Sequence, residues 1–236
     1  GPYAHRAGYD YIIQGMSGFM SITGEPDGAP QRAGVAIADI FTGVYSTTAI
    51  LSALHMRSST GRGQHIDMSL FDCAVSVMAN QSLNYLSTGN PPQRTGNYHP
   101  NLTPYQVFEC SDGQIIIATG NDAQYQRLCK LLNLDDLAAA PEFLKNADRV
   151  VNREKMIAQL MARTRKMTKL ELLQSCEAKG VPAGPINEMD DVFADPQIVH
   201  RQMQIDLDGI PSVRSPFNFS DADLKLDRPS PKLGEE

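Results

Sequence analysis

Asp39 is the residue of this chain whose type and surroundings best suit chemistry. It lies in the run Ala36-Ile37-Ala38-Asp39-Ile40-Phe41-Thr42-Gly43, among small or apolar neighbours. Carboxylates are seldom buried in such surroundings unless they are paired or hydrogen-bonded. The run opens a helical pattern, and the backbone N–H groups and dipole at a helix start favour negative charge. Two interpretations stay open: Asp39 caps the helix, or it is a positioned nucleophile.

Other groupings of reactive side chains are sparse. The five histidines are scattered and are not spaced with cysteines as metal ligands are, so no metal site is expected. The sequence has no nucleotide-binding glycine loop and no G-x-S-x-G elbow. The run Thr60-Gly61-Arg62-Gly63-Gln64 predicts either an anion-binding turn or a plain helix-to-strand turn. Arg57 and Arg62 lie on either side of this turn. They either contact phosphates or an acidic ligand, or they are solvated surface residues.

The elements that must position Asp39 follow from hydrophobic periodicity. Small Ala, Ser, Thr and Gly residues in the helix that holds Asp39 permit close packing against a neighbour. The next helix begins with the capping box Ser69-Leu70-Phe71-Asp72. In the first third of the chain the expected elements are helices over 8–19, 39–56 and 70–86, a loop over 23–30 and a strand over 65–70.

The rest of the chain has a different pattern. Residues 87–104 are rich in Gly and Pro and predict a linker. A hairpin is expected from Tyr105–Cys110 and Gln114–Ala118, because Asp112-Gly113 supplies the positive φ angles of a tight turn. The further expected elements are a helix capped by Asn121, helices over 146–164 and 168–179 (the second with the capping box Thr168–Glu171 and a terminating Gly180), an extended segment over 181–186, a short helix capped by Asn187, and short strands beyond Gln204.

The composition is that of an ordinary globular protein. Among 236 residues, 42% are hydrophobic and 20% charged, and the net charge of -6 gives no reason to expect a nucleic-acid partner. No apolar run approaches the ~20 residues of a membrane span, so no membrane partner is expected. No signal peptide is visible, and the opening without Met suggests a fragment of a longer protein. Structural thiols in a reducing compartment are expected from the four widely spaced cysteines, Cys73, Cys110, Cys129 and Cys176.

Short motifs, in order along nearly the whole chain, resemble those of the family III CoA-transferases. This family includes formyl-CoA transferase, carnitine CoA-transferase, the succinate–hydroxymethylglutarate CoA-transferases and the α-methylacyl-CoA racemases. The motifs are Gly8-Tyr9-Asp10, Gln14–Gly18, Thr23–Gly28, Ala38-Asp39 with Gly43, Thr60–Asp67, Gly96–Asn101, Pro104–Phe108, Asp112-Gly113, Gly180–Ile186 and Pro196-Gln197.

The resemblance implies an α/β fold and a fragment lacking the N-terminal part. The family chain begins with a Rossmann-like half that carries much of the CoA site, and its members form interlocked homodimers. The chain then divides into the second part of the large domain (1–86), a linker with the active-site loop (87–104), a small α/β domain (105–200) and a tail returning to the large domain (201–236).

The resemblance also implies that Asp39 is a covalent nucleophile forming an aspartyl-CoA thioester, with no permanently bound cofactor and a coenzyme A thioester as substrate. The family's mobile Gly-rich loop matches Gly96–Pro104. Here Tyr98-His99-Pro100-Asn101 replaces most of its glycines, as in the succinate-type subgroup. The residues expected to bind substrate or CoA are Tyr9, Gln14, Arg57, Arg62, Gly96, Asn97 and His99.

Several of these roles keep an alternative. His99 is either a contact for the acceptor carboxylate or a plain loop histidine. Gln14 and Asp67 orient neighbours or only pack, and Arg32 and Arg94 are expected to be surface residues. Asp122 aligns with a racemase active-site acid, or is a first-turn helix residue favoured by the dipole.

Position 9 separates the branches of the family, because the racemases have a histidine there and this chain has Tyr9. A tyrosine titrates near pH ~10 and is a poor base at neutral pH. The favoured hypothesis is therefore a CoA-transferase using succinyl-CoA or another dicarboxylyl-CoA with a small carboxylic acid. The alternatives are an α-methylacyl-CoA racemase and a catalytically inactive assembly fragment. The expected location is cytoplasmic, or the mitochondrial matrix if the source is eukaryotic.

Overall fold

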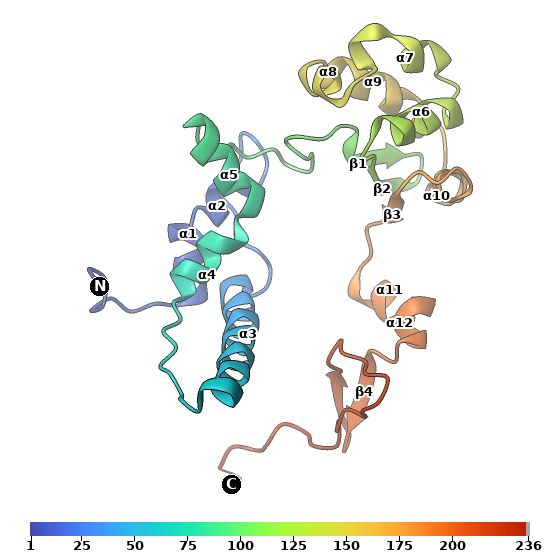
Figure 1. Cartoon of the computed structure of the whole chain (residues 1–236). Helices are drawn as coiled ribbons and strands as arrows, with labels where there is room; N and C mark the ends of the chain where they lie inside the picture. The colour runs from blue at the N-terminus through green and yellow to red at the C-terminus, as the bar shows by residue number, and fades with distance from the viewer. Residues whose placement is uncertain (235–236) are drawn as a thin grey trace.

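The chain follows an open path through three groups of elements in the computed structural model, which describes residues 1–234 (Figure 1). Helices fill the first group, a small sheet with covering helices forms the second, and two short helices with a hairpin form the third. The mixed helix and sheet content agrees with the predicted α/β class. The exact domain boundaries stay a prediction.

Five helices make up the amino-terminal group. They are α1 (Asp10–Met16), α2 (Phe19–Ile22), α3 (Ile37–Thr60), α4 (Leu70–Val77) and α5 (Ala79–Thr88). Their core is small: Ile13, Ala38 and Ala74 are buried together, with Leu70 and Phe71 packed against them. Two of the three buried residues are alanines, whose small side chains let α1, α3 and α4 approach closely. This contact is what holds the start of α3.

Three sequence predictions for this group need correction. The expected helix over 8–19 divides into α1 and α2 at Gly18, whose φ of 88° no helix adopts. The helix expected over 70–86 divides at Ala79, with a φ of 44°. The strand expected over 65–70 is wrong, because within residues 1–234 no other strand pairs with this segment, and a strand requires a partner.

Helix α3 exposes most of its apolar surface. It is long and apolar enough to cross a membrane by length and composition, and only 6% of its most apolar stretch is buried. The expectation that no segment approaches a membrane span is therefore wrong by this measure, since scattered Ser, Thr and Gly residues break the apolar run without lowering its mean hydropathy enough. This observation fits a membrane span, and it equally fits a surface that other protein covers.

The small domain is built on a three-stranded antiparallel sheet in the order β1-β2-β3. Its strands are β1 (Tyr105–Cys110), β2 (Gly113–Ala118) and β3 (Ala183–Pro185). The helices are α6 (Asp122–Leu131), α7 (Asp135–Ala139), η1 (Pro141–Phe143), α8 (Asn146–Val151), α9 (Arg153–Thr164) and α10 (Lys169–Ala178). The main buried core of the described chain lies here and runs in sequence from Phe108 to Val181. Because this domain closes its own core, its fold depends little on the first group.

Most local signals in the small domain are confirmed. The predicted hairpin forms, although Gly113 carries the positive φ (145°). Asp112 instead accepts a hydrogen bond from the Lys169 N–H at 2.7 Å. The Asn121 side chain caps α6, and the capping box Thr168–Glu171 starts α10 as predicted.

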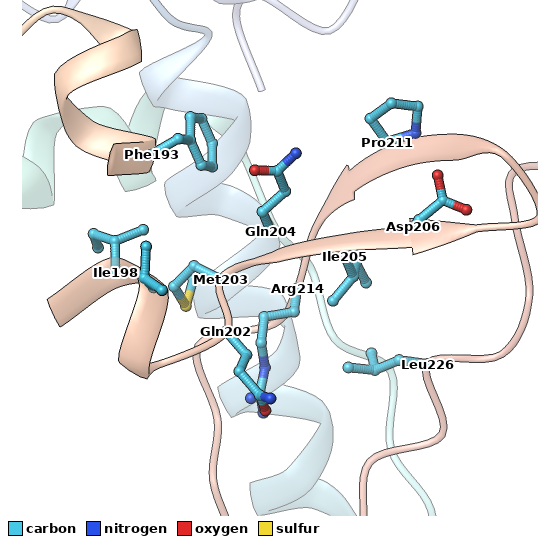
Figure 2. A pocket seen from close by; sticks show the side chains of 11 residues that line it. Phe193, Ile198, Gln202, Met203, Gln204, Ile205, Asp206, Pro211, Arg214 and Leu226 are labelled. Carbon is cyan, nitrogen blue, oxygen red and sulfur yellow. The ribbon is translucent and has the colours of Figure 1, made fainter. Parts of the chain in front are cut away.

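The third group contains helices α11 (Met189–Ala194) and α12 (Pro196–His200) and the hairpin of β4 (Gln204–Leu207) and β5 (Ile210–Val213). The predicted cap at Asn187 is wrong: the N-cap of α11 is Glu188, which forms a capping box with Asp191. A hollow of about 640 Å³ lies beside this hairpin, and Figure 2 shows the side chains that line it. Its Arg214 donates to the backbone oxygens of Arg201 and Phe217, so this cation ties the tail to the hairpin.

The four cysteines are free thiols, as predicted. Cys73, Cys129 and Cys176 are buried, and Cys110 is half-buried. Burial raises the pKa of Cys129 and that of Cys176 to about 11, so both remain protonated at neutral pH. Such thiols act as small apolar core residues, which agrees with a structural role.

Candidate active site

Asp39 lies in the first turn of α3 with its side chain exposed. The N-cap position belongs to Ala36, whose carbonyl accepts the first helical hydrogen bond from the Ile40 N–H at 3.0 Å. The interpretation of Asp39 as the capping residue is therefore wrong. Within residues 1–234 its carboxylate has no hydrogen-bond or ion-pair partner. The group is thus oriented by its backbone and left free for an incoming molecule.

The cap that Ala36 cannot provide comes from another helix. An alanine side chain has no acceptor, so the N–H groups of the first turn need one from elsewhere. The Asp10 carboxylate of α1 supplies it, because its Oδ1 accepts a hydrogen bond from the Ala38 N–H at 2.8 Å. This bond joins α1 to the residue that directly precedes Asp39.

Gln14 holds Asp10 and the chain before α3 in place. Its amide Nε2 donates to Asp10 Oδ2 at 2.7 Å and to the Val35 carbonyl at 3.3 Å. Its Oε1 accepts from the Ala33 N–H at 2.9 Å, and the residue is 1% exposed. All its hydrogen-bonding groups are engaged within the protein, which fits the alternative that Gln14 orients its neighbours. Its predicted contact with a substrate stays a prediction.

Tyr9 lies beside this network, whereas the two predicted arginines lie far from it. Tyr9 is the N-cap residue of α1 and is 73% exposed, so its ring is available next to Asp10. Arg57 is in the last turn of α3, about 27 Å along the helix from Asp39. Arg57 and Arg62 are both exposed, and neither forms an ion pair with a residue of the described chain. A ligand that contacts both Asp39 and Arg57 must therefore extend along α3.

The loop that contains Gly96 is fastened to the turn over residues 23–28. The Gly96 N–H donates to the Gly24 carbonyl at 3.0 Å, and Arg94 Nε donates to the Glu25 carbonyl at 3.2 Å. Gly96 has a φ of 59°, and a Cβ there would lie 3.0 Å from Glu25 Oε2. The backbone conformation therefore favours glycine, while the exposed Glu25 side chain has room to turn away from a new Cβ. The motifs that contain Gly24 and Gly96, residues 72 positions apart in the sequence, thus form one structure.

A hollow of about 480 Å³ lies on one side of this loop, against α2, the α4–α5 junction and the start of α5. Asn97 and His99 line it, and Asn97 is exposed. Its lining is apolar, aromatic and amide, and no carboxylate of the described chain is among the lining residues. The full set of lining residues is Phe19, Ile22, Val77, Met78, Asn80, Gln81, Gly96, Asn97, Tyr98, His99, Pro100 and Tyr105.

Asp122 belongs to a different environment. It forms an ion pair with Arg149 at 2.9 Å, and Arg149 is 1% exposed and also donates to the carbonyls of Thr103 and Phe143. Burial opposes ionisation of Asp122, but the hydrogen bond and charge of Arg149 hold its pKa below the ordinary value. The geometry favours the first-turn structural role of Asp122 over that of an active-site acid.

The sequence-predicted residues therefore fall into separate places. The structure brings Tyr9 and Gln14 to the start of α3 with Asp39, and it brings Gly96, Asn97 and His99 to one loop. Within residues 1–234 no hydrogen bond or ion pair joins Asp39 to that loop. Arg57 and Arg62 reach neither place.

Sequence reasoning missed three residues that shape these places: Asp10, Arg94 and Arg153. Asp10 and Gln14 are four residues apart on a predicted helix, a spacing at which side chains interact, so that signal was present. The sequence predicts Arg94 as a surface residue, yet its side chain holds the loop to the Glu25 carbonyl. Arg153 donates to the carbonyls of His99 and Pro100, and no local sequence pattern links residues so far apart.

Comparison with known proteins agrees with the motifs. The profile of the family described as CoA-transferase family III matches residues 1–236. Succinate–glutarate CoA-transferase of Agrobacterium fabrum is 51% identical over 240 residues, which cover 100% of this chain and 60% of that protein. Succinyl-CoA:glutarate CoA-transferase of Mus musculus is 37% identical over 240 residues, which cover 100% of this chain and 55% of that protein.

A solved structure agrees as well. The crystal structure of a CAIB/BAIF family protein from Brucella suis has 57% sequence identity and a TM-score of 0.82, and the match covers 98% of this chain and 61% of that one. The chain thus spans about 60% of the length of the Agrobacterium fabrum relative and of the Brucella suis protein. With the family match extending over its whole length, the chain belongs to CoA-transferase family III.

Proposed function

We propose that the whole protein transfers coenzyme A between succinyl-CoA, or another dicarboxylyl-CoA, and a second small dicarboxylic acid. The names of the relatives support the substrate class, since the two described above act on succinate or succinyl-CoA and glutarate. Tyr9 in place of a histidine supports transfer over racemisation, because a phenol is a poor base for removing an α-proton at neutral pH.

The observation that carries this proposal is the exposed, unpaired carboxylate of Asp39 in the first turn of α3. The dipole of this 24-residue helix stabilises negative charge at its start. A carboxylate nucleophile and the oxyanions that form beside it both carry negative charge, so this position suits the proposed chemistry. Nothing in the described chain competes for the carboxylate.

The proposed reaction proceeds through four exchanges at carbonyl carbons. An Asp39 oxygen attacks the thioester carbonyl and expels CoA thiolate, which leaves a mixed anhydride. The thiolate attacks the Asp39 carbonyl of this anhydride, so the donor acid departs with one Asp39 oxygen and an aspartyl-CoA thioester remains. The acceptor carboxylate attacks that thioester and again frees the thiolate. The thiolate then attacks the acceptor carbonyl, which yields the new acyl-CoA and regenerates the Asp39 carboxylate.

This scheme needs no permanently bound cofactor, because the coenzyme A thioester is itself the substrate. The predicted interlocked homodimer and the cytoplasmic or matrix location belong to the same proposal. A dimer agrees with the amount of apolar surface that α3 leaves uncovered.

Chemical trapping tests the proposal. When the whole protein is incubated with succinyl-CoA and hydroxylamine, the peptide containing Asp39 should become a hydroxamate, and Asp39→Ala should abolish transfer. Asp72→Ala is the matched control, because Asp72 is also an exposed acid in the first turn of a helix. Full transfer activity in Asp39→Ala, or a hydroxamate on another carboxylate only, would refute the role of Asp39.

A further inference from the structure

The loop over residues 95–102 has an internal framework centred on the imidazole of His99. His99 Nδ1 accepts hydrogen bonds from two backbone N–H groups, that of Asn101 at 3.0 Å and that of Leu102 at 3.1 Å. An imidazole nitrogen accepts only when it carries no proton, so this geometry requires a neutral ring with its proton on Nε2. The side chain thus closes the turn that follows it.

Arg153 fixes the backbone of the same turn from α9. Its Nη2 donates to the His99 carbonyl at 2.8 Å and to the Pro100 carbonyl at 3.3 Å. Its guanidinium lies 4.4 Å from the centre of the Tyr98 ring. A permanent positive charge next to the imidazole disfavours a second one, so Arg153 both holds the turn and opposes protonation of His99.

Within residues 1–234, the remaining surroundings of His99 add no negative charge. The Tyr105 ring of β1 lies 5.2 Å from the imidazole, and the α2, α4 and α5 side chains that line the adjoining hollow are apolar or amides. The charged or titratable groups that face His99 are therefore Arg153, Tyr98 and Tyr105. Burial, followed by the charge of Arg153, lowers the pKa of His99 below its ordinary value of 6.5.

We propose that His99 is a positioning residue for the transfer reaction, whose neutral imidazole holds the 95–102 loop in the shape that receives the acceptor acid. The consequence for catalysis rests on the proposed function, whereas the consequence for the loop does not. Protonation removes the acceptor at Nδ1 and releases the N–H groups of Asn101 and Leu102. The loop is therefore ordered above pH 6.5 and opens as the pH falls through the lowered pKa of His99.

Two substitutions distinguish the role of Nδ1 from that of Nε2 in the His99 ring. In His99→Asn, the amide oxygen takes the place of Nδ1, still accepts both N–H bonds and cannot be protonated. In His99→Gln, the polar atoms lie near the place of Nε2 and the acceptor for the turn is lost. His200→Asn, an exposed histidine at the end of α12, is the control.

Hydrogen exchange measured on the whole protein tests the loop without any need for activity. At neutral pH, the Asn101 and Leu102 amides should exchange about tenfold faster in His99→Gln than in the wild type, and stay protected in His99→Asn. In the wild type their protection, corrected for intrinsic exchange, should fall as the pH drops below 6.5. Unchanged protection in His99→Gln, or a wild-type protection that is independent of pH, overturns the proposal even if the variants fold poorly.

Kinetics then test the positioning role. In the wild type, kcat/KM for the acceptor acid should fall as the pH is lowered. At neutral pH, His99→Asn should keep kcat/KM within about threefold of the wild type, and its kcat/KM should not show this fall at lower pH. His99→Gln should fall about tenfold at every pH. If His99→Asn keeps the protected turn but loses activity as His99→Gln does, His99 acts through Nε2 on the substrate and the positioning role is wrong.

Discussion

The carboxylate of Asp10 caps the helix that presents Asp39, through a 2.8 Å hydrogen bond from the N–H of Ala38. The acceptor comes from α1, and the N-cap residue Ala36 supplies none. Orientation of the proposed nucleophile is thereby linked to a contact between two helices. The bond gives Asp10 a function that its place in the sequence did not reveal.

Asp10→Ala should destabilise the whole protein by about 1 kcal/mol, the usual cost of losing a helix cap, and should lower kcat more than it raises KM. Asp10→Asn keeps one acceptor but loses the partner of the Gln14 amide, so it should lie between Asp10→Ala and the wild type. Urea unfolding and steady-state kinetics measure both effects. Asp190→Ala, at an exposed first-turn acid of α11, is the control. An Asp10→Ala variant with normal kcat would show that the cap does not position Asp39.

Gly96→Ala should distort the loop, because the residue has a φ of 59° and the new Cβ would meet Glu25 Oε2. The expected loss of stability is about 1 kcal/mol. Adding Glu25→Ala relieves the contact but not the backbone strain, so the double variant should recover only part of the loss. Gly63→Ala is the control, because a Cβ there meets no atom within 4 Å. Equal stability of Gly96→Ala and the wild type would show that the loop adapts.

The ion pair of Asp122 and Arg149 should make the free energy of unfolding depend on pH in the acid range. The pKa of Asp122 is lower in the folded protein than in the unfolded chain, so its contribution is present above the ordinary value of 3.8 and is lost as the pH falls through the folded value. Asp122→Asn should cost about 1 kcal/mol at neutral pH, since the carboxylate is partly solvated. The difference from the wild type should shrink below pH 3.8.

Urea unfolding of both proteins across this pH range measures the effect. Asp136→Asn, at an exposed first-turn acid of α7, should show no such dependence. A cost for Asp122→Asn that stays constant down to the lowest pH would show that the pair does not titrate as proposed.

The exposed face of α3 should be covered in a whole protein of the relatives' length. Val44 is 57% exposed here, so Val44→Asp should cost little in this chain alone but about 2 kcal/mol or more in the whole protein. Val151→Asp is the matched control, at a valine that is 83% exposed in the small domain. Sedimentation of the whole protein with membranes would instead favour α3 as a membrane span.

Much of the small domain could be predicted from its sequence, although the helix expected over 146–164 divides into α8 and α9 at Asn152, and α7 and η1 were not predicted. Its signals are local: the caps at Asn121 and Thr168, the hairpin glycine Gly113 and the helical spacing of Tyr125, Leu128 and Cys129 each act within a few residues. They agree with one another because this domain buries its own core.

The amino-terminal group was less predictable because its elements depend on distant partners. Residues 65–70 alternate as a strand does, but pairing decides whether a strand forms. The roles of Asp10 and Arg153 likewise arise only when residues 28 or 54 positions apart meet. The motif around Asp39 points to this residue as the proposed nucleophile, whereas the groups that hold it are visible only in the structure.

Isotopic labelling of Asp39 tests the central claim most directly. In the proposed scheme the acceptor carboxylate leaves one of its own oxygen atoms in the regenerated Asp39. After one turnover of the whole protein with oxygen-labelled acceptor acid, mass spectrometry should find one labelled oxygen in the peptide that contains Asp39, and none in the peptide that contains Asp72. Turnover that leaves the Asp39 carboxylate unlabelled would contradict the account.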